Sequence, residues 1–184
     1  MTITEIKAIL EREINDTVTN PNIAAWVYSA LVEISKKYGR IVEWSQVAVV
    51  DTLYNLPADY LATSAIIDSD GEPYFDYEIT EFGQIAFKKD DTFNIQYFAM
   101  PAALPTIEAD MLATIPEAHL IFHPAIVDWC KHKYWDNEAS VLGVDQGESG
   151  FADKFKMSFY QQVADSVLVL KNRAHKKRRI RLAR

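Results

Sequence analysis

The sequence contains little cysteine, glycine or proline: one, six and seven residues respectively among 184. The single cysteine, Cys130, excludes an intrachain disulfide and favours assembly in a reducing compartment. So few glycine and proline residues, together with 12% aromatic residues, exclude a collagen-like or disordered chain. With 49% hydrophobic residues the chain can build a core, and we expect one domain with room for a small appended lobe.

Long hydrophobic runs are also absent. No apolar stretch approaches the roughly 18–20 residues that are needed to span a membrane. Residues 1–5 lack the basic region followed by an apolar run that is typical of a secretory signal. We therefore expect a soluble protein that is made in the cytoplasm and does not bind a membrane.

Acidic residues are missing from residues 171–184, although the whole chain has 26 acidic against 19 basic residues and a formal charge of −7. Removing the eight basic residues of this stretch leaves 11 basic and 26 acidic residues, so residues 1–170 carry −15. Such a basic segment is typical of contacts with an acidic protein partner or with nucleic acid. A solvated cationic end is the alternative. The eight residues are Lys171, Arg173, Lys176, Lys177, Arg178, Arg179, Arg181 and Arg184.

The first forty residues have the pattern of two helices. Thr2 and Glu5 form a capping-box pattern ahead of isoleucines at helical spacing, which predicts a short amphipathic helix. Asn20 as N-cap and Pro21 at the first helical position predict a second helix over 21–38.

The last third of the chain is also helical in pattern. Pro124 predicts the start of a helix that runs to about residue 139, and the glycines of 143–150 predict a break. A final helix is expected from Phe151, long enough for its end to project from the body. Its apolar residues recur at near-heptad spacing: Phe155, Phe159, Val163, Val167 and Leu170.

The middle of the chain is rich in strand-forming residues and turns. Residues 68–71 predict a turn, and 83–88 with 92–98 alternate on either side of Lys89-Asp90-Asp91, which predicts a hairpin. We therefore expect a small antiparallel β insertion over about 44–100. The fold class is α+β and mainly α: a helical bundle over 1–170, and a long C-terminal helix that ends in a basic arm over 171–184.

Residues suited to catalysis or metal binding follow no recognisable spacing. His119, His123, Cys130 and His132 do not form a zinc-binding pattern, so we expect no metal and no cofactor. There is no glycine-rich phosphate loop and no nucleophile elbow, and Cys130 lies on an apolar helix face, where a buried thiol is expected. An enzyme is therefore not expected.

Four features together resemble one protein family. They are the helical pair that ends near Tyr38, the Y-x-L-P-x-D turn within 54–61, the aromatic strand and proline-bearing linker of 97–105, and the order of elements from 115 onward. In these features the chain resembles the head-to-tail adaptor (connector) proteins of tailed bacteriophages.

The resemblance implies a structural virion protein of the neck, made in the host cytoplasm. Family members pack side by side into a ring, commonly of twelve copies, on the portal protein, and DNA passes through the centre. The C-terminal segment commonly reaches the portal, so the basic arm is the candidate portal contact. The β element typically faces the next tail component, for which the hairpin tip is the candidate contact: Lys88, Lys89, Asp90 and Asp91.

The charge distribution agrees with this role, because an acidic body would not hold DNA that moves past it. From the residues alone, a second function stays open: a nucleic-acid-binding module whose basic arm, residues 171–184, grips phosphate.

Overall fold

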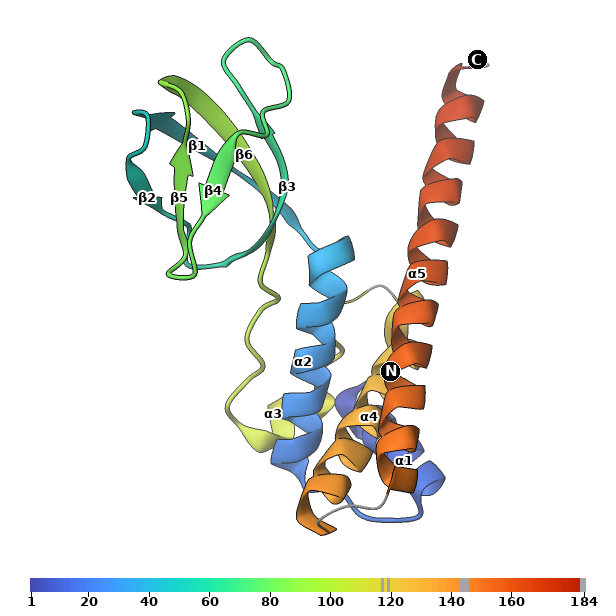
Figure 1. Cartoon of the computed structure of the whole chain (residues 1–184). Helices are drawn as coiled ribbons and strands as arrows, with labels where there is room; N and C mark the ends of the chain where they lie inside the picture. The colour runs from blue at the N-terminus through green and yellow to red at the C-terminus, as the bar shows by residue number, and fades with distance from the viewer. Residues whose placement is uncertain (117, 119, 143–145, 183–184) are drawn as a thin grey trace. The chain divides into compact units, whose positions relative to one another are not determined.

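The computed structural model describes residues 1–116, 118, 120–142 and 146–182, and their side chains except those of 139–142, 146–149 and 172–182. The chain divides into two compact units, coloured along the sequence in Figure 1. We call Met1–Ile34 with Ala102–Arg184 the helical unit, and Ser35–Pro101 the β unit. Within the described residues the two units hold five α-helices and two antiparallel sheets, which confirms a mixed α+β fold.

The two predicted N-terminal helices are present. The first, α1 (Ile3–Ile14), has the complete capping box: Glu5 N donates to Thr2 Oγ1, and Thr2 N donates to Glu5 Oε2 at 2.8 Å. The second, α2, spans Asn20–Tyr38. Asn20 is the first residue of this helix and not the predicted N-cap, because the bond that opens the helix runs from Ile23 N to the carbonyl oxygen of Thr19. The Oδ1 of Asn20 accepts a hydrogen bond from Lys7 Nζ at 2.6 Å.

The helices after the β unit extend beyond their predicted bounds. A short helix α3 (Glu108–Ala113) and a 3-10 turn η1 (Leu120–Phe122) precede α4 (His123–Leu142). The last helix, α5, spans Gln146–Leu182, so residues 146–150 of the predicted break are helical, and residues 143–145 lie outside the described residues. The glycines there were interpreted as a break, yet a glycine inside a helix costs only about 1 kcal/mol relative to alanine.

The α4 and α5 helices form an antiparallel pair. Ser166 Oγ donates to the carbonyl oxygen of Ile121 at 3.3 Å, which places this point of α5 beside the start of α4. The 20 residues of α4 span about 30 Å, whereas the 37 residues of α5 span about 55 Å. The last turns of α5 therefore extend past the length of α4. No helix among the described residues has the length and apolar character to cross a membrane.

The core of the helical unit is built from the apolar faces that the sequence predicts. On α5, Phe159 and Val163 are buried, and Phe155, Val167 and Leu170 are partly buried. Burying one large apolar side chain stabilises the fold by about 1.5–3 kcal/mol. The other elements contribute Ile3, Ile6 and Leu10 of α1, Ile23, Val27 and Leu31 of α2, and Ile126 and Cys130 of α4.

The β unit consists of two three-stranded antiparallel sheets, and the structure describes all of its residues. In the first sheet the order is β1-β6-β3, and in the second it is β2-β5-β4. The strands are β1 (Ile41–Ala48), β2 (Leu53–Asn55), β3 (Tyr60–Ile67), β4 (Tyr77–Ile79), β5 (Gln84–Phe87) and β6 (Asp91–Ala99).

The predicted hairpin is wrong, because β5 and β6 belong to different sheets. The chain crosses between the sheets at residues 88–90, and this crossing lets Phe87 of β5 stack on Phe93 of β6 with ring centroids 4.2 Å apart. Both rings are fully buried. The predicted turn at 68–71 is confirmed: Gly71 has φ +85°, a conformation that favours glycine, and its N–H donates to Asp68 O.

Candidate interaction surfaces

The basic arm begins within α5, with no break between the helix and the arm at residue 171. Lys171 is the one predicted contact residue of the arm whose side chain the structure describes, and it is exposed. The side chains of the other seven lie outside the described residues: Arg173, Lys176, Lys177, Arg178, Arg179, Arg181 and Arg184.

The predicted contact at residues 88–91 joins the two sheets and is not a free hairpin tip. Lys88 Nζ lies 3.0 Å from a carboxylate oxygen of Asp51 and 3.7 Å from one of Glu78. The hydrogen bond with Asp51 raises the pKa of Lys88 above its ordinary value. Asp90 accepts a hydrogen bond from Val50 N at 2.6 Å.

Lys89 has the larger set of partners. Its Nζ lies 2.8 Å from Asp91 and 3.0 Å from Asp68, both mostly buried carboxylates, and 5.3 Å from the centre of the Tyr74 ring. These bonds raise the pKa of Lys89, with Asp91 as the largest cause, and lower those of Asp91 and Asp68, with Lys89 as the largest cause. All four predicted contact residues of this segment therefore have partners within the β unit.

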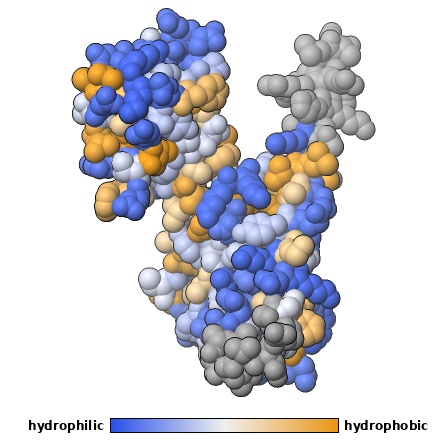
Figure 2. All heavy atoms as spheres, in the orientation of Figure 1, coloured by the Kyte–Doolittle hydropathy of each residue, from blue (hydrophilic) through white to orange (hydrophobic). Residues whose placement is uncertain are grey.

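The sequence interpretation missed two exposed aromatic residues of the β unit. Phe75, just before β4, is 84% exposed, and Phe82, in the turn between β4 and β5, is 81% exposed. Figure 2 shows hydrophobic residues on the surface of this unit. The sequence does contain a signal for such exposure: in Glu81-Phe82-Gly83 an aromatic residue lies next to a turn-forming glycine. An aromatic residue in a turn is not expected to lie in the core.

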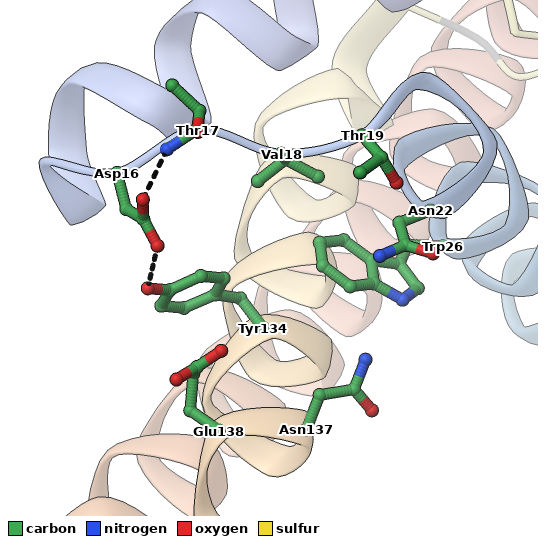
Figure 3. Close-up of a pocket in the computed structure, with 9 residues that line it drawn as sticks. All are labelled: Asp16, Thr17, Val18, Thr19, Asn22, Trp26, Tyr134, Asn137 and Glu138. Carbon is green, nitrogen blue, oxygen red and sulfur yellow. Dashed lines mark hydrogen bonds between the residues drawn. The ribbon is translucent and has the colours of Figure 1, made fainter. Parts of the chain in front are cut away.

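A pocket of about 420 Å³ lies between the α1–α2 connection and α4 in the helical unit (Figure 3). Tyr134 Oη donates to one carboxylate oxygen of Asp16 at 2.7 Å, and Thr17 N donates to the other at 2.7 Å. These two bonds, with the tyrosine as the larger cause, lower the pKa of Asp16. The lining residues are Asp16, Thr17, Val18, Thr19, Asn22, Trp26, Tyr134, Asn137 and Glu138.

The pocket is suited to hydrogen-bond donors and cations. Two of the nine lining residues, Asp16 and Glu138, are acidic and none is basic. The sequence did not predict this site, because Asp16 and Tyr134 are 118 positions apart and only the packing of α1 against α4 joins them.

The residues considered for metal binding lie mostly in the core. Cys130 is fully buried, as predicted, and burial raises the pKa of its thiol. His132 is buried beside Trp129, its Nδ1 lies 3.1 Å from the carbonyl oxygen of Ala152, and burial lowers its pKa. His123 is buried at the start of α4, and His119 lies outside the described residues. In the described part of the chain, no three His, Cys, Asp or Glu side chains could hold a metal ion.

A comparison with models of known protein families finds no match, and a comparison with curated proteins finds none either.

Proposed function

We propose that this chain is a head-to-tail adaptor of a tailed bacteriophage, a structural protein of the virion neck without enzymatic activity. Its copies form a ring, commonly of twelve in such proteins, that joins the portal to the tail and lets DNA pass through its channel. The observation that carries the proposal is the arrangement of a β unit inserted between helices whose last member continues into a basic segment.

The helical unit suits the wall of the ring. In the proposal α1, α2, α4 and α5 form a bundle that packs against the bundles of neighbouring copies. The net charge of −15 on residues 1–170 supports a position beside moving DNA, since an acidic wall repels phosphate.

The basic arm suits the portal contact. It continues a helix that is longer than its partner α4, so it can reach a surface beyond the helical unit. An acidic surface on the portal would attract the arm and fix its orientation, because complementary charge raises the association rate and disfavours wrong registers.

The β unit suits the contact with the next neck protein. Lys88, Lys89, Asp90 and Asp91 are engaged inside the unit, so Phe75 and Phe82 are the better candidates for this contact. Exposed aromatic side chains supply much of the binding energy at many protein interfaces.

Electron microscopy of the protein mixed with its candidate portal tests the proposal. We expect the full chain to add a ring of density to the portal, and a chain without residues 172–184 to add none. The matched control keeps the length and replaces the seven basic residues of 172–184 by glutamine. If the positive charge of the arm is what binds the portal, this variant should add no ring of density either. A portal that gains no ring from the full chain would disprove the adaptor function, whereas unchanged binding of the deleted chain would disprove only the role of the arm.

The density of positive charge in the arm also favours a second function, binding of nucleic acid. That function predicts an affinity for duplex DNA whose logarithm falls with the logarithm of salt concentration, with a slope near −0.9 for each neutralised phosphate. Negligible binding at low salt would exclude it.

A further inference from the structure

The β1 strand leaves one of its edges open. Among the residues that the structure describes it pairs with β6 alone, over all eight of its residues and without a register shift. The other outer strands of the β unit, which is described throughout, are less suited to pairing: β3 has two register shifts, and β2 and β4 have three residues each. Proteins usually protect such edges with charged side chains, proline or a bulge. The β1 strand has no proline and no bulge, and Glu43 is its one charged residue.

The register identifies the backbone groups at this edge. Ala99 N donates to Arg40 O, so this opposed pair exchanges hydrogen bonds, and such pairs alternate along an antiparallel ladder. The residues of β1 that bond to β6 are therefore the even-numbered ones. The N–H and C=O groups of the odd-numbered residues point to the open edge: Ile41, Glu43, Ser45 and Val47.

These four residues also have exposed side chains, with Ile41 53% and Val47 70% exposed. Read along the strand, they are apolar, polar, polar and apolar, which is the same order in both directions. One of the four carbonyls has a local bond, because Gln46 Nε2 donates to Val47 O at 2.6 Å. A carbonyl oxygen has two lone pairs, so this bond leaves it able to accept another.

We propose that β1 pairs with β1 of a second copy of this chain, antiparallel and about a two-fold axis at Trp44. In this register Ile41 faces Val47 of the second copy, and Glu43 faces Ser45 of the second copy. A shift that centres the axis on Glu43 would oppose two like charges, which destabilises a strand pair. A shift that centres it on Ser45 would oppose Ile41 to Val49, which lies outside the strand.

Both copies use the same strand edge in this pairing, so the assembly contains two chains and does not grow further. The two three-stranded sheets join into one six-stranded sheet. It concerns the free protein and does not rest on the proposed adaptor function. The occupant is a second copy because the order of the four edge residues is self-complementary.

Sedimentation of the full chain over a range of concentrations tests the pairing. We expect a concentration-dependent dimer that the substitution Ser45→Pro abolishes and Ser45→Ala retains. The N–H of Ser45 points away from β6, so proline removes no bond inside the sheet. A monomer at every concentration, or an undiminished dimer of S45P, would overturn the proposal.

Two substitutions of Ser45 by charged residues provide a second test that does not depend on the folding of S45P. Ser45→Glu opposes Glu43 of the second copy twice in the dimer, and should raise the dissociation constant about tenfold. Ser45→Lys occupies the same exposed position with the opposite charge and should bind at least as tightly as the unchanged chain. Equal dissociation constants for the two variants would place the dimer contact elsewhere.

Cysteine cross-linking tests the register itself. Opposed residues of a hydrogen-bonded pair have Cα atoms about 5.5 Å apart, which a disulfide can bridge. A mixture of Glu43→Cys and Ser45→Cys chains should form a disulfide-linked dimer, while each variant alone should form much less. The native Cys130 is buried and does not compete. Equal cross-linking of either variant alone would contradict this register.

Discussion

At the scale of single residues, the hydrogen bond between Tyr134 and Asp16 joins α4 to the α1–α2 connection and lowers the pKa of Asp16. The bond lowers the pKa of Asp16 below its ordinary value of 3.8, and a second bond from Thr17 N adds to this effect. A carboxyl group whose pKa is lower in the folded state stabilises the fold above its unfolded pKa. That contribution is lost as the pH falls through the folded pKa.

We therefore predict that Tyr134→Phe raises the pKa of Asp16 toward 3.8, because the larger of the two bonds is removed. The titration of the Asp16 carboxyl carbon, followed by NMR, measures the change. Tyr160→Phe is the matched control, since Tyr160 Oη donates to Glu33 and not to Asp16. An Asp16 pKa that is equal in the Y134F variant and the unchanged chain would show that the bond has no electrostatic effect.

At the scale of elements, Lys89 holds together the end of β3 and the start of β6. Its ammonium bonds Asp68, just after β3, and Asp91, the first residue of β6. Both carboxyl groups have a pKa below 3.8 in the folded state, and Lys89 is the first cause in each case. Their contribution to stability is present above pH 3.8 and is lost as the pH falls through the folded values.

We predict that Lys89→Met destabilises the β unit near neutral pH and makes its unfolding free energy less dependent on pH below 3.8. Urea titrations at several pH values, followed by a β-unit signal, measure both effects. Lys88→Met is the control, because Lys88 bonds Asp51 and Glu78 and leaves the Asp68 and Asp91 bonds intact. The same acid dependence in K89M and the unchanged chain would show that these bonds do not contribute.

The sequence predicted the helices more accurately than the pairing of the strands. Helix starts depend on nearby residues, as in the bond between Thr2 and Glu5, and apolar spacing identified the buried face of α5. Strand pairing depends on residues far apart. Residues 89–91 have the composition of a hairpin turn, but the chain continues into a different sheet because Phe87 and Phe93 bury each other across the core.

At the scale of the whole molecule, the candidate surfaces are products of tertiary structure. The charge and position of the basic arm could be read from composition. The pocket of Asp16 and Tyr134, and the open edge of β1, could not, because each depends on which distant segments pair. The sequence interpretation began the β insertion near residue 44, after the first residues of the strand that supplies this edge.

The two units have separate hydrophobic cores, which leads to a prediction about their stability. Phe159 is fully buried in the core of the helical unit, and Phe87 is fully buried in the core of the β unit. Truncating a buried phenylalanine to alanine costs about 3–5 kcal/mol. If each core stabilises its own unit, each truncation should act mainly on the unit that contains it.

We therefore predict that Phe159→Ala speeds amide hydrogen exchange in α1, α4 and α5 and leaves β1, β3 and β6 protected. Phe87→Ala should give the opposite pattern. Each variant is the control for the other, since both remove the same side chain from a fully buried site. Faster exchange in both units of both variants would mean that the chain unfolds as one cooperative body. In that case loss of either core would destabilise the pocket and the β1 edge together.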